Sequence, residues 1–160
     1  MKRNRGFTLV EMMMVVFIIG ILAVMGFPAM NRMMSTQAVR SAAYDLFADL
    51  VYARSEAITR GTTVSVLPVD AAGDWKKGWT IRENGGGTTL RDQPERTSQL
   101  SFTGPASSVT FERTGRAQNA ATVQFAIGPS DTGYVVQDHM KRCVRLDPSG
   151  RPRSAEGACT

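Results

Sequence analysis

GFTLVEMMMVVFIIGILAVMGFPAM, residues 6–30, is the most apolar segment of the chain, and it predicts a helix near the N-terminus. Within residues 7–30, Glu11 is the one charged residue. Residues 12–30 carry no charge, and at about 1.5 Å of rise per residue they match the roughly 30 Å core of a bilayer. Three basic residues precede the segment: Lys2, Arg3 and Arg5. The positive-inside rule therefore places residues 1–6 in the cytoplasm and the rest of the chain across the membrane.

Two other interpretations explain the apolar segment less well. A secretory signal peptide needs a small-residue cleavage site after the apolar run, and the residues around Ala29 match such a site poorly. A plain single-pass anchor leaves Glu11 without a purpose. A carboxylate inside an apolar span costs about 2.5–3.5 kcal/mol on insertion scales, so Glu11 is a candidate functional residue.

Gly6-Phe7-Thr8-Leu9-Val10-Glu11, followed by an apolar run, resembles the prepilin peptidase site of type IV pilins and type II secretion pseudopilins. The resemblance implies that prepilin peptidase removes a leader, residues 1–6, by cutting after Gly6, and that Phe7 is N-methylated. It implies a helix over residues 7–30 that anchors the protein in the bacterial inner membrane and later packs against other pilins in a filament. Glu11 would then pair with the new amine of Phe7, from its own or a neighbouring helix, which offsets the desolvation of the carboxylate.

Residues 31–61 continue as an amphipathic helix. Apolar residues recur at helical spacing and form one face, namely Val39, Ala42, Leu46, Leu50, Ala53 and Ala57. Gly61 is a natural stop signal. We expect this face to hold a globular domain.

Residues 62–160 predict a periplasmic β-rich domain that ends in a basic loop. Short runs typical of strands alternate with Gly- and Pro-rich turns. The strand candidates are Thr62–Leu67, Trp79–Arg82, Gln99–Phe102, Val109–Glu112, Thr122–Ile127, Tyr134–Gln137 and Arg142–Leu146. Because no helical pattern separates them, the sheets should be antiparallel. The fold class is α+β: a long N-terminal helix packed against an antiparallel, β-rich domain.

A closer resemblance extends along most of the chain. Leu50–Arg60, Val64–Val66 and Trp75–Trp79 are similar to the FimT/GspH family of type IV minor pilins and type II secretion pseudopilins. We read Trp75 and Trp79 as packing residues.

No constellation of catalytic residues is evident. His139 is the only histidine, which excludes a histidine metal cluster. We expect no enzyme activity, no metal and no cofactor. Cys143 and Cys159 form an even pair in an exported protein and predict a disulfide, worth roughly 3 kcal/mol for a loop of about 15 residues. Two free thiols in a cytosolic protein are the alternative.

The excess of basic over acidic residues in the domain lies in residues 139–160. The candidate DNA-binding residues are Lys141, Arg142, Arg145, Arg151 and Arg153. On a loop clamped by the disulfide, guanidinium groups suit phosphate because each donates two parallel hydrogen bonds. A merely solvated loop is the alternative. Gly150-Arg151-Pro152-Arg153 resembles the GRxR motif of DNA-binding FimT proteins, which implies non-specific DNA binding in natural transformation. A pilin that acts only in assembly, or a GspH-like pseudopilin, remains possible on the sequence.

Overall fold

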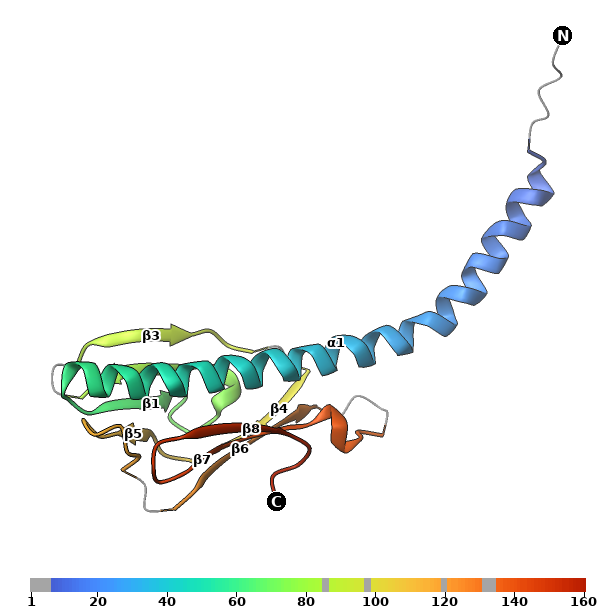
Figure 1. Cartoon of the computed structure of the whole chain (residues 1–160). Helices are drawn as coiled ribbons and strands as arrows, with labels where there is room; N and C mark the ends of the chain where they lie inside the picture. Colours follow the sequence, from blue (N-terminus) through green and yellow to red (C-terminus); the bar gives the residue numbers. More distant parts are fainter. Residues whose placement is uncertain (1–6, 85–86, 97–98, 119–120, 131–134) are drawn as a thin grey trace, which may run out of the picture. The chain divides into compact units, whose positions relative to one another are not determined.

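The computed structural model describes residues 7–160, apart from residues 85–86, 97–98, 119–120 and 131–134 and the side chains of residues 25–29 (Figure 1). The predicted leader, residues 1–6, lies outside the described residues. The chain divides into two compact units, Met1–Met34 and Ser35–Thr160. One helix, α1 (Leu9–Arg60), contributes to both units.

The part of α1 in the first unit carries a dense apolar surface. Its large side chains from Leu9 to Val24 are exposed to solvent. Among the residues that the structure describes, no helix combines the length and the apolar character needed to cross a membrane. The predicted span, residues 7–30, includes residues 25–29, whose side chains lie outside the described residues, and membrane anchoring stays a prediction.

The part of α1 in the second unit packs one face onto the β-rich domain, as predicted. All six residues of the predicted stripe are buried, with exposures of 1% or less. The helix ends at Arg60, and Gly61 adopts a left-handed conformation with φ of 65°. The predicted stop is therefore confirmed, since glycine takes this conformation without the steric cost that a Cβ brings.

Two four-stranded antiparallel sheets complete the second unit (Figure 1). The first has the order β3-β2-β1-β5, with β1 Val64–Pro68, β2 Trp79–Glu83, β3 Thr89–Gln93 and β5 Val109–Phe111. The second has the order β4-β6-β7-β8, with β4 Leu100–Thr103, β6 Val123–Pro129, β7 Arg142–Leu146 and β8 Pro152–Glu156. Two 3-10 turns, η1 (Trp75–Lys77) and η2 (Asp138–Met140), lie between strands. The predicted α+β class with antiparallel sheets is confirmed.

Aromatic side chains join the two sheets in the core. Trp75 meets Phe125 edge-on with 4.9 Å between ring centroids, and Trp79 meets Phe102 at 5.8 Å. Both indoles keep a hydrogen-bond partner although they are buried: Trp75 donates to the Pro105 carbonyl at 2.7 Å. Trp79 donates to the carboxylate of Asp49, which is itself buried, at 2.9 Å. The prediction that the tryptophans are packing residues is confirmed.

Six of the seven predicted strands are present within a few residues of their predicted bounds. The seventh is wrong: residues 135–137 are not a strand but lead into η2, and Tyr134 lies outside the described residues. Two strands, β3 and β8, were not predicted. Both lie at sheet edges and carry mostly exposed or half-buried residues, so they lack the alternation of apolar and polar residues that marks a strand.

The prediction of a basic loop after Leu146 is also wrong for residues 152–156, which form β8. The chain instead folds back as a β-hairpin, in which β8 pairs with β7 from Arg142↔Glu156 to Leu146↔Pro152. Pro152 does not break the hairpin because it is the first residue of an edge strand, where no ladder hydrogen bond needs its missing N–H.

Candidate functional site

The residues predicted to act in processing and assembly lie just before α1 and in its first turn. Gly6 lies outside the described residues, and Phe7 is exposed. The Thr8 hydroxyl accepts a hydrogen bond from the Glu11 N–H at 3.2 Å, and the Glu11 carboxylate accepts one from the Thr8 N–H at 3.5 Å. This reciprocal pair is a capping box, which satisfies backbone donors at the helix start. The carboxylate also lies where the helix dipole favours negative charge.

The basic residues near the end of the chain lie on the β7–β8 hairpin. Its tight turn is closed by a hydrogen bond from the Gly150 N–H to the Asp147 carbonyl at 2.8 Å. Gly150 has φ of 77°, and a Cβ at this position would overlap the carbonyl oxygen of Gly115. The glycine of the Gly150-Arg151-Pro152-Arg153 motif is therefore required for packing as well as for the turn.

The predicted disulfide is present and stiffens the same hairpin. Cys143 lies in β7 and is bonded to Cys159, with 5.1 Å between the Cα atoms. It ties residues beyond β8 back to the central part of the sheet. The hairpin is thus held by its ladder, its turn and the disulfide.

Four of the five candidate DNA-binding residues have a partner in the chain, and three of them have it within 3.0 Å. Lys141 pairs with Asp138 at 3.0 Å, and Arg142 pairs with Glu156 at 2.6 Å. The Arg142 hydrogen bond lowers the pKa of the Glu156 carboxyl from its ordinary value. Arg145 donates to the main-chain oxygen of Thr160 and to its hydroxyl at 3.0 Å.

The other two candidates, Arg151 and Arg153, lie at the turn end of the hairpin. Arg153 is 72% exposed and approaches Asp147 at 3.4 Å. Arg151 is exposed, and within the described part of the chain its side chain has no hydrogen-bond or ion-pair partner. Arg142 and Leu146 are four residues apart in β7, so about 13 Å separates the two ends of the hairpin. The five cations therefore do not form one cluster.

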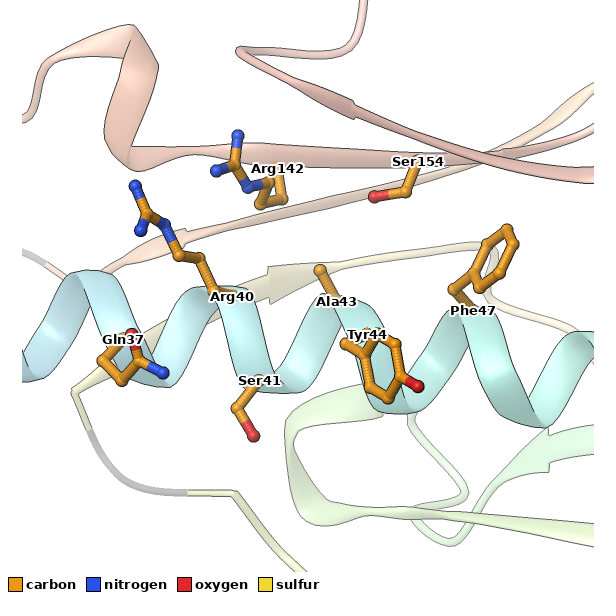
Figure 2. Close-up of a pocket in the computed structure, with 8 residues that line it drawn as sticks. All are labelled: Gln37, Arg40, Ser41, Ala43, Tyr44, Phe47, Arg142 and Ser154. Atoms are coloured by element: carbon orange, nitrogen blue, oxygen red, sulfur yellow. The ribbon is translucent and has the colours of Figure 1, made fainter.

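A groove that was not predicted from the sequence lies between α1 and the hairpin (Figure 2). It has a volume of about 680 Å³ and is lined by Gln37, Arg40, Ser41, Ala43, Tyr44, Phe47, Arg142 and Ser154. Figure 2 shows the guanidinium groups of Arg40 and Arg142 on one side of the groove and the rings of Tyr44 and Phe47 at the other end. The sequence feature that could have indicated this groove is Tyr44, an aromatic residue beside the buried stripe of α1 that is itself exposed.

The described residues hold no group of three or more histidine, cysteine, aspartate or glutamate side chains placed to bind a metal ion. His139 lies exposed in η2.

Two family models match this chain, and together they cover both its N-terminal segment and most of its globular domain. Residues 42–150 match the family described as type II transport protein GspH. Residues 1–27 match the prokaryotic N-terminal methylation motif. No curated protein gives a significant sequence match.

Solved structures give the same result for the fold. The type IV minor pilin FimU of Pseudomonas aeruginosa is 27% identical, with a TM-score of 0.59 over 73% of this chain and 87% of that one. The minor pseudopilin EpsH of the Vibrio cholerae type II secretion system is 15% identical, with a TM-score of 0.55 over 74% of this chain and 96% of that one. These relatives are pilins and pseudopilins rather than enzymes. Since the GspH match covers more than half of the sequence, the chain belongs to the FimT/GspH family of type IV minor pilins and type II secretion pseudopilins.

Proposed function

We propose that this protein is a FimT-like minor type IV pilin that joins a pilus and binds DNA for uptake in natural transformation. Prepilin peptidase removes residues 1–6, Phe7 becomes the methylated N-terminus, and residues 7–30 anchor the protein in the inner membrane before assembly. Support comes from the methylation-motif match and from the exposed apolar surface of α1 between Leu9 and Val24. That surface offers other pilins a large hydrophobic contact, which is unusual for a monomer in water.

Intact-mass measurement of membrane-extracted protein tests the processing step. The mass should correspond to a chain that begins at Phe7 and carries one methyl group. Protein that keeps residues 1–6 in a strain with active prepilin peptidase contradicts this part of the proposal.

One observation carries the DNA-binding proposal: Arg151 and Arg153 lie exposed at the tip of a hairpin that a disulfide and a β-ladder hold in shape. Arg151 has no acidic partner among the described residues, and the contact of Arg153 with Asp147 is long and solvent-exposed, so it competes weakly with phosphate. Residues 141–160 contain no aromatic side chain for stacking on bases and no α-helix for the major groove. Phosphate contact without sequence preference is the mechanism that remains.

The experiment is a titration of the full mature chain, in non-ionic detergent, with duplex DNA at several salt concentrations. We expect a dissociation constant of roughly 10⁻⁴–10⁻⁶ M near physiological salt. The double substitution R151Q/R153Q should weaken binding to every duplex alike and make the log–log salt slope less steep by about 1.8. R40Q/R82Q is the matched control, since it removes the same charge from exposed sites elsewhere in the domain. If R151Q/R153Q binds like the parent, the hairpin tip is a solvated surface and the DNA-binding proposal fails.

A role as a type II secretion pseudopilin is the second candidate, because the family description and the EpsH fold point to it. A pilin that acts only in assembly is the third. Deletion of the gene separates the candidates: loss of secreted enzymes indicates the pseudopilin. Loss of piliation without any DNA binding by the protein indicates the assembly factor.

A further inference from the structure

The turn of the β7–β8 hairpin packs against a second turn that is distant in the sequence. Residues 112–116 form a hairpin turn after β5, closed by a hydrogen bond from the Glu112 N–H to the Arg116 carbonyl at 2.8 Å. The Ala117 N–H donates to the Pro148 carbonyl at 3.2 Å. A Cβ on Gly150 would also lie 3.3 Å from the Arg116 Cα. The two turns therefore touch through their backbones and form one rigid surface.

Arginines without acidic partners gather on this surface. Arg113 and Arg116 on the β5 turn are exposed, like Arg151 beside Gly150. Within the described residues, no carboxylate pairs with any of these three side chains. Arg54 of α1 lies behind the β5 turn, close to Gly115, and its buried Nε has no hydrogen-bond partner. Arg153 adds a further charge through its exposed guanidinium.

Acidic groups near this surface are few and do not neutralise it. Glu112 is half-buried and makes no ion pair with a described residue. Among the described residues, the Asp147 carboxylate pairs with Arg153 alone, at 3.4 Å. The opposite end of the β7–β8 hairpin differs, because Lys141 and Arg142 each have a carboxylate within 3.0 Å. A phosphate that binds there must displace a short ion pair. A phosphate at the two turns meets the unpaired guanidinium groups of Arg113, Arg116 and Arg151, and the only ion pair among the described residues there is the longer contact of Arg153 with Asp147.

We propose that the DNA-binding surface consists of the two packed turns, with Arg113 and Arg116 added to Arg151 and Arg153, and that it excludes the ion-paired Lys141 and Arg142. The inference rests on the proposed DNA binding and assigns its residues. Four guanidinium groups carried by two touching turns suit the closely spaced phosphates of a duplex, each of which accepts two parallel hydrogen bonds from one arginine.

Salt dependence of binding tests this assignment, because the slope counts the phosphates that the protein neutralises. The full mature chain in non-ionic detergent is titrated with one duplex between about 50 and about 200 mM salt. Four contacts predict that the affinity of the parent falls by about 150-fold over this range, and two contacts predict a fall of about 12-fold. We expect the affinity of R113Q/R116Q to fall by about 12-fold over this range. The affinity of R113K/R116K should fall by about 150-fold, like that of the parent, since lysine retains the charge. K141Q/R142Q, which removes the same charge from the paired end, should follow the parent.

The outcomes separate the inference from the proposal on which it rests. If R113Q/R116Q keeps the salt slope of the parent while R151Q/R153Q loses it, the proposed function stands and this inference is wrong. If K141Q/R142Q flattens the slope as strongly as R113Q/R116Q, the excluded residues belong to the surface and the assignment is also wrong. If the parent does not bind DNA at all, the proposed function fails and the inference fails with it. Thermal unfolding midpoints of R113Q/R116Q, R113K/R116K and R151Q/R153Q that equal the midpoint of the parent show that these exposed substitutions left the fold intact.

Discussion

Gly150 lets the turn of the β7–β8 hairpin pack closely against the β5 turn. Its replacement by alanine tests how much this contact contributes to stability. The residue has φ of 77°, a left-handed conformation that costs an alanine about 1–2 kcal/mol. The added methyl group would also overlap the Gly115 carbonyl, so one turn must move away from the other. Overpacking of this kind costs a further 1–3 kcal/mol, roughly. We expect Gly150→Ala to lower the free energy of unfolding by about 2–5 kcal/mol in total.

Gly61→Ala is a matched control for the backbone strain. Gly61 has φ of 65°, close to that of Gly150, but a Cβ there would meet no atom within 4 Å. Both substitutions restrict the unfolded chain in the same way. The difference between the two losses of stability therefore measures the steric conflict alone.

Urea unfolding of the unit Ser35–Thr160 supplies the measurement, since every residue of the hydrophobic core lies within that unit. The loss of unfolding free energy caused by Gly150→Ala should exceed the loss caused by Gly61→Ala by at least about 1 kcal/mol. It should also weaken DNA binding, because the two arginine-bearing turns separate. Equal losses of stability for the two variants refute the packing of Gly150 against Gly115 as the reason for this glycine.

Three other predictions concern the ends of the chain. Cys159→Ser should lower the free energy of unfolding by about 2–4 kcal/mol, measured by urea unfolding, since it opens the only disulfide of the chain; a loss below about 0.5 kcal/mol contradicts this. Thr8→Val should weaken the helix start by about 1 kcal/mol but leave filament entry intact, whereas Glu11→Ala should block filament entry; normal recovery of Glu11→Ala in sheared pili refutes the assembly role. The Glu156 carboxyl should titrate below the ordinary glutamate pKa in NMR, and Arg142→Gln should raise that pKa. Because the folded pKa is lowered, the Arg142–Glu156 pair contributes stability above the ordinary pKa and loses it as the pH falls through the lowered value.

Most of the fold could be predicted because local patterns and the final structure agree. The stripe from Val39 to Ala57 has helical spacing and is buried. Central strands such as β6 alternate buried residues with exposed or half-buried ones along their length. The edge strands β3 and β8 could not be predicted in this way, since one ladder of hydrogen bonds holds each of them and their side chains face solvent.

The sequence identified the candidate residues, but it did not show which of them have partners in the folded chain. Charge along the sequence places Lys141, Arg142 and Arg145 beside Arg151 and Arg153. Spacing does not reveal that Glu156 returns to face Arg142, or that Asp138 lies within reach of Lys141. The role proposed for the β5 turn could not be predicted either. Nothing in the sequence near Arg113 indicates that this turn packs beside Gly150.

The four residues of Gly150-Arg151-Pro152-Arg153 have different roles in the hairpin. Only the two arginines contribute charge. Gly150 allows the turn to pack on Gly115, and Pro152 begins the edge strand that returns along β7. Arg151 directly precedes β8 and Arg153 lies within it, and both side chains are exposed at the turn end of the hairpin. A basic tail of equal charge without this glycine would lack the close approach of the hairpin turn to Gly115 and Arg116 of the β5 turn. The order of the four residues, rather than their net charge, therefore places the arginines of the proposed surface together.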